Sequence, residues 1–171
     1  MKESIRAMYG YAFMTMADKD VPDNQIVRFG DSITAGMNVT DTVNMGIGCD
    51  TWETALHRAW MVTSVRPKHV FIMLGINDLQ LEHSVQEVTK NARKLLDYIR
   101  VVAKCRFTVH SVITNEPRLS HRVHRLNKAL QAIVSTGGSF VTVATRPDYF
   151  APDRIHLSAT GNAALSSTLY K

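Results

Sequence analysis

Three side chains of this sequence have the chemistry of an acyl-transfer site: one serine, one histidine and one aspartate. Ser32 lies in the turn Gly30-Asp31-Ser32, whereas Asp153 and His156 lie three residues apart in the segment DRIH. A serine hydroxyl is a weak nucleophile until an adjacent base takes its proton, and an imidazole with an ordinary pKa of roughly 6.5 is mostly neutral at pH 7. His156 can therefore act as the base, and Asp153 can orient its ring and stabilise the imidazolium.

The same chemistry needs hydrogen-bond donors for the oxyanion of the tetrahedral intermediate. The Asn77 carboxamide in the segment GIND and the backbone N–H groups of the glycine-rich turn at residues 46–50 are suitable donors. Each signal also has a purely structural interpretation, because Ser32 could cap the segment that follows it and Asn77-Asp78 could simply form a turn. We interpret Asp31 and Asp78 as turn and cap residues rather than as acids in the reaction.

Five short apolar runs, separated by helical patterns, predict the elements that position these residues. The expected strands are residues 25–29, 42–47, 69–74, 107–113 and 139–143. Strands that alternate with helices indicate an α/β fold with a parallel sheet, in which ligands bind at the carboxyl ends of the strands. The serine, the asparagine and the segment DRIH each follow a predicted strand, so the sheet is expected to bring them together.

Signals for helix N-termini support this alternation. Asp50 and Ser84 are each followed three residues later by a glutamate, which is the spacing of a capping box. A third helix is expected before the glycine pair at 137–138, and Ser158 can cap a last helix near the C-terminus. Two tryptophans of the first helix are interpreted as core residues: Trp52 and Trp60.

Four sequence blocks resemble those of the SGNH hydrolases, also called the GDSL esterase/lipase family. The blocks are FGDSITAG at 29–36, NMGIGCDT at 44–51, GIND at 75–78 and DRIHLSATG at 153–161. They occur in the family's order and together span most of the chain. The resemblance implies a three-layer flavodoxin-like fold with a five-stranded parallel sheet, and it implies no metal or organic cofactor. It also implies a catalytic triad: Ser32, His156 and Asp153.

The oxyanion hole implied by this resemblance consists of the Ser32 backbone N–H, a backbone N–H of the second block and the Asn77 side chain. In the family a glycine precedes the Asp-Thr pair of the second block, whereas this chain has Cys49 there. The backbone N–H survives this substitution, but a positive φ is costly for a residue with a Cβ. Cys49 is therefore the expected second donor, and Gly48 is the alternative.

Length and composition are those of an ordinary globular chain. The 171 residues correspond to a single domain, 45% of them are apolar, 20% are charged, and the net charge is +5. No run of 18 or more apolar residues is present, so no membrane span is expected. Cys49 and Cys105 match no zinc spacing, and two thiols in such a chain favour a reducing compartment.

The first 20 residues are expected to form an amphipathic helix that packs on the domain. Ile5, Met8, Ala12 and Met16 have helical spacing. The segment lacks the leucine-like run and the small-residue cleavage site of a signal peptide. We therefore expect a cytoplasmic protein, with secretion left open.

A cluster of basic residues lies in the third predicted helix. It comprises Arg118, Arg122, Arg125 and Lys128, beside His121 and His124. Because the neighbouring cations repel a metal ion, the two histidines are not expected to bind one. No nucleic-acid motif or interleaved aromatic residue accompanies the cluster, so a solvated helix face is expected rather than a nucleic-acid site.

Together these observations predict a serine esterase that acts on a small acyl ester, such as an acetyl group on a sugar. A chain of this length leaves little room for a lid, so the site should be shallow. Hydrolysis of lysophospholipids or thioesters is the alternative within the enzyme class. A non-catalytic binding module on the same fold is the alternative from another class, and the presence of Ser32, Asn77, Asp153 and His156 argues against it.

Overall fold

A computed structural model of the chain describes residues 25–134 and 137–170, so the helix expected within residues 1–20 lies outside the described residues. In the described part, five strands form one parallel sheet in the order β2-β1-β3-β4-β5. The strands are β1 (Ile26–Gly30), β2 (Thr42–Gly46), β3 (His69–Met73), β4 (Arg106–His110) and β5 (Ser139–Val141). This is the strand order of flavodoxin-like folds, and it confirms the predicted α/β fold with a parallel sheet.

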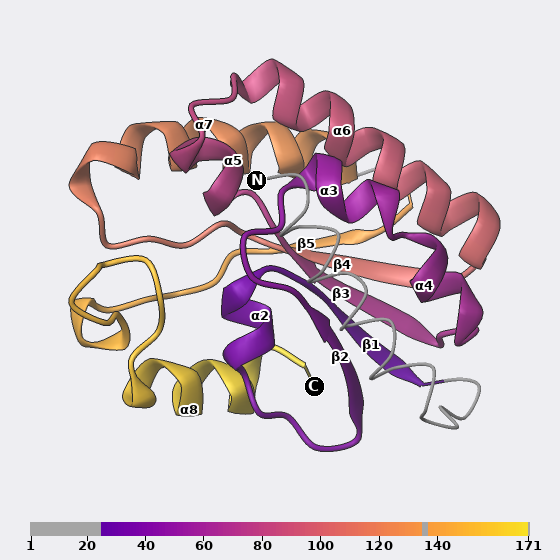
Figure 1. Cartoon of the computed structure of the whole chain (residues 1–171), viewed down its shortest axis with the longest axis horizontal. Coiled ribbons are helices and arrows are strands. Elements are labelled where there is room, and N and C mark those ends of the chain that lie inside the picture. The colour runs from indigo at the N-terminus through magenta and orange to yellow at the C-terminus, as the bar shows by residue number, and fades with distance from the viewer. Residues whose placement is uncertain (1–24, 135–136, 171) are drawn as a thin grey trace.

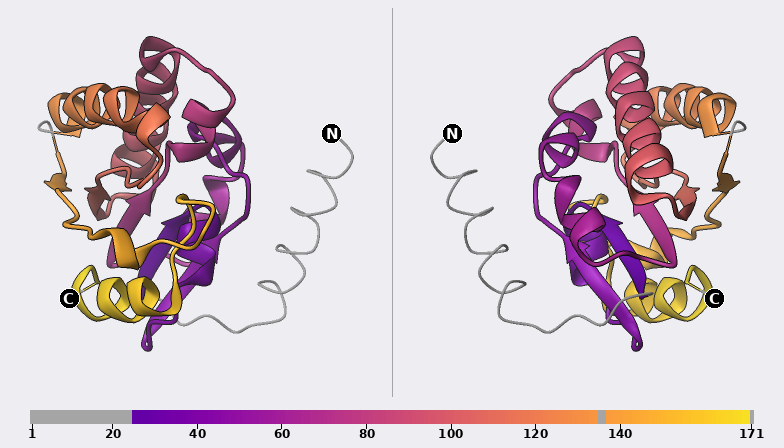
Figure 2. Two further views of the ribbon diagram at one scale, coloured as in Figure 1. Left: turned by 90° about the vertical axis from the view of Figure 1, so that its left-hand side faces the viewer. Right: turned by 90° about the vertical axis from the view of Figure 1, so that its right-hand side faces the viewer.

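Helices cover both faces of the sheet and complete the predicted three layers (Figures 1 and 2). The upper layer in Figure 1 contains α3 (Trp52–His57), α4 (Trp60–Ser64), α5 (Ile76–Gln80), α6 (Val85–Tyr98) and α7 (Pro117–Val134). A π-helical turn, η1 (Ile99–Ala103), continues α6. The lower layer contains α2 (Ser32–Gly36) and α8 (Ala159–Thr168), and a 3₁₀ turn, η2 (Pro147–Tyr149), precedes α8.

The core lies between the sheet and the two long helices. Four of the five residues of β3 are buried, as its almost continuous apolar sequence predicts. The apolar stripes of α6 and α7 occur every three or four residues and face inward. Their buried side chains are Val88, Ala92, Leu95 and Leu96 in α6, and Val123, Leu126, Leu130, Ile133 and Val134 in α7.

Two of the three predicted helix caps are confirmed and one is wrong. Ser84 forms a capping box with Glu87, and the Ser158 side chain accepts a hydrogen bond from the Gly161 N–H. The N-cap of α3 is Thr51 rather than Asp50, because the Asp50 carboxylate is bound to a buried arginine described below.

The core assignment is correct for Trp52 and wrong for Trp60. Trp52 is fully buried, and its indole N–H donates to the carbonyl of Leu74. Trp60 is 47% exposed. The predicted helix is interrupted between α3 and α4, so the two tryptophans do not share one helix face.

Candidate active site

The carboxyl end of β1 carries the first of the predicted site residues. Ser32 is the first residue of α2 and follows β1 after a single residue. Asp31 is the N-cap of this helix, and its carboxylate accepts a hydrogen bond from the Ile33 N–H at 3.0 Å. Because Asp31 provides the cap, the Ser32 hydroxyl is available for another interaction. The alternative in which Ser32 is only a cap is therefore not supported.

Close packing around this turn requires a glycine at residue 30. A Cβ on Gly30 would lie 2.2 Å from the Thr34 hydroxyl oxygen and 2.4 Å from the Met73 carbonyl oxygen. Only glycine, which has no Cβ, therefore allows the end of β1 to approach β3 and α2 this closely. This packing fixes the turn that places Ser32 at the carboxyl end of β1 and the start of α2.

The loop before α8 brings a histidine and an aspartate to Ser32. The Ser32 Oγ lies 2.9 Å from the His156 Nε2, and the His156 Nδ1 lies 2.6 Å from the Asp153 Oδ2. The other oxygen of Asp153, Oδ1, accepts hydrogen bonds from the backbone N–H groups of Ile155 and His156, each at 2.9 Å. Ser32 and His156, which are 124 positions apart in the chain, thus form one continuous chain of hydrogen bonds with Asp153.

These contacts determine the ionisation of the aspartate. The hydrogen bond from His156, followed by that from the Ile155 N–H, lowers the pKa of Asp153 to about 2. An ionised Asp153 favours the tautomer in which the His156 Nδ1 carries the proton and Nε2 presents its lone pair to Ser32. In this arrangement His156 can accept the Ser32 hydroxyl proton. The side chains of Asp153 and His156 are 50% and 52% exposed, so the site is open to solvent.

The candidate oxyanion donors lie in the turn after β2 and near the start of α5. Asn77, near the start of α5, donates a side-chain N–H to the Asp50 carbonyl at 2.9 Å. A carboxamide has two N–H donors, so the second one remains for a ligand. Within the described residues Cys49 has a positive φ of 63° and Gly48 does not. The left-handed residue of the turn is therefore Cys49, at the place where the resemblance expects glycine.

Replacing Cys49 by glycine should relieve the backbone strain without changing activity. A left-handed conformation costs a residue with a Cβ about 1–2 kcal/mol. Glycine avoids this cost, but the greater freedom of its unfolded chain lowers the free energy of unfolding by about 0.5–1 kcal/mol. We expect Cys49→Gly to raise the free energy of unfolding by up to about 1 kcal/mol, as measured by urea denaturation.

A matched substitution tests the same conformation from the other side. Cys49→Val introduces a β-branched side chain, for which a positive φ is a genuine outlier, so this variant should be less stable than the parent. Proline is unsuitable for deleting the Cys49 N–H, because its φ is locked near −65°. If Cys49→Gly unfolds at a lower urea concentration than Cys49→Val, the backbone of Cys49 is not strained.

A buried arginine that sequence reasoning missed joins the two turns. Arg58, 3% exposed, forms an ion pair with Asp50 and also donates to the carbonyls of Gly30 at 3.0 Å and Met45 at 2.9 Å. Its guanidinium lies 4.0 Å from the centroid of the Phe29 ring. Arg58 therefore connects the turn of Ser32 to the turn of Cys49. No local pattern marks the pair in the sequence, because Asp50 precedes the N-cap of α3 and Arg58 follows its last residue.

Removing this arginine should strongly destabilise the protein. Arg58→Met leaves the Asp50 carboxylate buried without its ion-pair partner and removes one donor each from the carbonyls of Gly30 and Met45, and breaking a buried pair in this way costs about 3–5 kcal/mol. We expect a loss of this size in urea unfolding. Arg58→Lys keeps the charge and should lose less, so equal losses for the two variants would show that the charge is unimportant.

Two buried carboxyl groups beneath the site have structural positions, as predicted. Burial raises the pKa of Asp31 to about 7 and that of Asp78 to about 6. Asp31 caps α2, and the Asp78 Oδ2 accepts a hydrogen bond from the Trp52 N–H at 3.1 Å. Neither contacts the hydroxyl of Ser32 in the described structure, which accords with their interpretation as turn and cap residues.

The basic cluster of α7 is mostly solvent-exposed. Arg118, His121, His124, Arg125 and Lys128 are exposed, whereas Arg122 donates to the carbonyls of Leu79 and His83 and thereby holds α5. In residues 25–134 and 137–170, no group of three or more His, Cys, Asp or Glu side chains could hold a metal ion. None of the helices in this part of the chain is long and apolar enough to span a membrane.

A comparison with known protein families finds a match over most of the chain. The model of the GDSL-like Lipase/Acylhydrolase family matches residues 29–164, which include the Ser32 turn, the Asn77 turn and the segment DRIH. No curated protein sequence matches the chain at a significant level.

Several solved structures have the same fold. A carbohydrate esterase of family 3 from Talaromyces cellulolyticus is 16% identical with a TM-score of 0.71, and the match covers 85% of this chain and 94% of that one. An acetyl esterase with an acetate ion is 15% identical with a TM-score of 0.72, covering 85% and 94%. AlinE4, an SGNH-hydrolase family esterase, is 22% identical with a TM-score of 0.62, covering 86% and 93%. At these identities the similarity shows the fold.

Proposed function

This chain belongs to the GDSL-like lipase/acylhydrolase family, and from that premise we propose that it is a serine esterase acting on small acyl esters. The observation that carries the proposal is the hydrogen-bonded chain from the Ser32 Oγ through His156 to Asp153. A hydroxyl, an imidazole and an ionised carboxylate in this order are the parts of a serine hydrolase triad.

In the proposed mechanism, the Ser32 Oγ attacks the acyl carbon while the His156 Nε2 takes the hydroxyl proton. The resulting oxyanion accepts hydrogen bonds from the Ser32 N–H, the Cys49 N–H and the free N–H of the Asn77 carboxamide. When the tetrahedral intermediate collapses, the alcohol leaves with the proton from Nε2 and the acyl group stays on Ser32. A water molecule then attacks the acyl carbon while Nε2 takes its proton. The carboxylic acid is released, and the Ser32 Oγ leaves with the proton from Nε2, which restores the hydroxyl.

The openness of the site supports a small acyl group. Because the side chains of His156 and Asp153 are both about half exposed, the reacting atoms lie near the surface. A long acyl chain at such a place would remain largely in water and would gain little from apolar burial. Acetyl esters of carbohydrates are our preferred substrates, supported by the similarity to a carbohydrate esterase and to an acetyl esterase.

Hydrolysis of p-nitrophenyl acetate, butyrate and octanoate tests the proposal, with Ser32→Ala as the matched control. We expect kcat/KM to be highest for acetate and turnover to depend on Ser32. A preference for octanoate would favour the lysophospholipase or thioesterase alternative. If none of the three esters shows turnover that depends on Ser32, the hypothesis of a non-catalytic binding module is favoured instead.

The pH dependence tests the base when the parent is compared with Asp31→Asn, because the pKa of Asp31 is also raised into the neutral region, to about 7. His156 must be neutral to accept a proton, so kcat/KM for a chemistry-limited ester should rise with pH through one ionisation in the neutral region. Asp153, with its pKa lowered to about 2, remains ionised throughout this range, so the acid limb does not belong to it. A profile that stays flat from about pH 5 to 8 would argue against histidine as the base.

A further inference from the structure

The positive charge of the protein is concentrated in one part of the chain. Residues 85–134 contain ten Lys and Arg against three Asp and Glu, whereas the rest of the sequence contains ten against twelve. The longest helix of the described residues, α7, has no acidic residue among its 18. The net charge of +5 therefore originates from the surface formed by α6, α7 and their connection.

This surface has a groove between α6 and α7 with a volume of about 630 Å³. Three cations of α6 line it, Lys90, Arg93 and Lys94, together with the polar residue Thr89, and Ala129 of α7 lies opposite. None of the three cations forms an ion pair with a described residue, in contrast to Arg58 and Arg100. Unneutralised cations in a concave site favour a negatively charged ligand.

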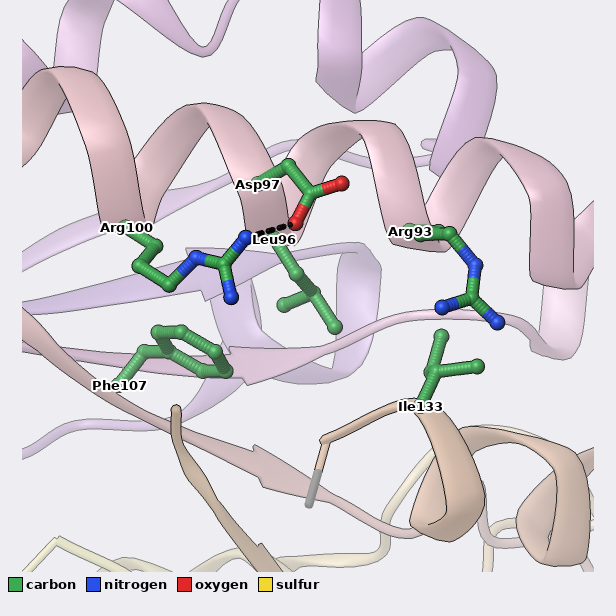
Figure 3. A pocket seen from close by; sticks show the side chains of 6 residues that line it. All are labelled: Arg93, Leu96, Asp97, Arg100, Phe107 and Ile133. Carbon is green, nitrogen blue, oxygen red and sulfur yellow. Dashed lines mark hydrogen bonds and ion pairs between the residues drawn. The ribbon is translucent and has the colours of Figure 1, made fainter. Parts of the chain in front are cut away.

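A smaller hollow continues the groove along α6 (Figure 3). Arg93 and Asp97 border both hollows. Figure 3 shows the Arg93 side chain extending from α6 toward Ile133 of α7. The carboxylate of Asp97 is paired with Arg100 at 2.8 Å. The one acidic group of the groove is thus already partnered, and the cationic character of the lining remains.

The groove starts at the first residue of α6. Its first lining residue, Val85, follows α5, the helix that carries Asn77. At the other side, the Asn115 N–H just before α7 donates to the carbonyl of Arg154, which lies in the loop of His156. The helix α7 thus begins beside the loop of His156, and it carries three exposed cations along its length: Arg118, Arg125 and Lys128.

We propose that the α6–α7 groove binds an acidic polysaccharide, so that the ester is hydrolysed while an anionic sugar chain lies between the two helices. This inference rests on the proposed function, because it names the molecule that carries the acyl ester. Carboxylates along such a chain would pair with the lysines and with the Arg93 guanidinium, which can bind a carboxylate with two hydrogen bonds.

The lining favours a polysaccharide over two other polyanions. Single-stranded nucleic acids are bound by stacking on exposed aromatic rings, and the one aromatic residue lining either hollow, Phe107, is 4% exposed. Proteins that bind a bilayer surface present cations beside exposed apolar side chains on a projecting face. The three cations of α6 line a groove instead. An extended, charged and hydroxyl-rich chain fits both observations.

The test compares two charge reversals in exposed lysines, one inside the groove and one outside it. Lys90→Glu changes the groove, and Lys68→Glu makes the same change outside it, just before the central strand β3. For acetylated polygalacturonate at low salt, we expect Lys90→Glu to lower kcat/KM about tenfold through KM, with a change below about twofold for Lys68→Glu. Both variants should hydrolyse p-nitrophenyl acetate like the parent.

A binding measurement separates this inference from the proposed function. Fluorescence anisotropy of labelled oligogalacturonate with the Ser32→Ala protein should give saturable binding that weakens in Lys90→Glu and at high salt. No binding, or equal weakening in the Lys68→Glu control, would overturn the inference even if p-nitrophenyl acetate is hydrolysed. Tighter, Lys90-dependent binding to single-stranded DNA or to phosphatidylglycerol vesicles would replace the polysaccharide by that polyanion.

Discussion

Substitution of Ser32 by alanine is expected to lower kcat for p-nitrophenyl acetate by about 10⁶. The hydroxyl is the only group of the Ser32–His156–Asp153 chain that can form the acyl-enzyme, because His156 is bound to it through Nε2 and Asp153 lies behind the imidazole. The fold should be unaffected, since the cap of α2 is Asp31 and not Ser32. Urea unfolding of the variant should match that of the parent.

Two companion measurements make this result specific. His156→Ala should cost about as much as Ser32→Ala, and the double variant should be no worse than either one, because members of a triad act as a unit. A fluorophosphonate should modify the parent stoichiometrically at Ser32. Ordinary turnover by purified Ser32→Ala, or an adduct mapped to another serine, would refute the nucleophile assignment.

The fold could be predicted because alternating apolar runs and helical patterns leave few arrangements for a chain of this size. The residues of the candidate site could be proposed for the same reason. Ser32, Asn77 and the segment DRIH each follow a predicted strand, and the strands of a parallel sheet end at a common edge. The observed contact between Ser32 and His156 spans 124 residues, yet it needs only that topology and two short turns.

Strand ends were less predictable, because they depend on contacts made by distant residues. The run at 107–113 predicts a strand that continues past His110, where β4 ends. In the structure, the Asn127 side chain of α7 takes the place of a neighbouring strand: its Oδ1 accepts from the Val112 N–H at 2.8 Å and its Nδ2 donates to the Val112 carbonyl at 2.9 Å. No local pattern in the strand shows this interaction.

The wrong cap of α3 has a similar cause. Locally, Asp50 is as good an N-cap as Thr51, since both side chains can accept a backbone hydrogen bond. The choice is made by Arg58, which is buried and needs an anionic partner, so Asp50 turns toward it and Thr51 forms the cap instead. Burial of Arg58 is a property of the packed fold, which the local sequence does not reveal.

Substitution of Asp153 by asparagine is expected to lower kcat by about 10⁴, and the structure indicates why so small a change should matter. The Asp153 Oδ1 accepts two backbone hydrogen bonds, from Ile155 and His156, and only an oxygen can occupy that position. The amide of asparagine must therefore direct its Nδ2 toward the His156 Nδ1, where Oδ2 now lies at 2.6 Å. A donor at this place favours the imidazole tautomer with its proton on Nε2, which cannot accept the proton of Ser32.

Two measurements on the asparagine variant distinguish this cause from simple loss of charge. Nitrogen NMR of the His156 ring should show the proton moved from Nδ1 to Nε2, and kcat should fall while KM for p-nitrophenyl acetate changes little. Asp153→Glu is the matched control, because it keeps a carboxylate that can accept the Nδ1 proton, and it should retain more activity than asparagine. An asparagine variant with full activity, or with the His156 proton still on Nδ1, would show that Asp153 does not orient the base.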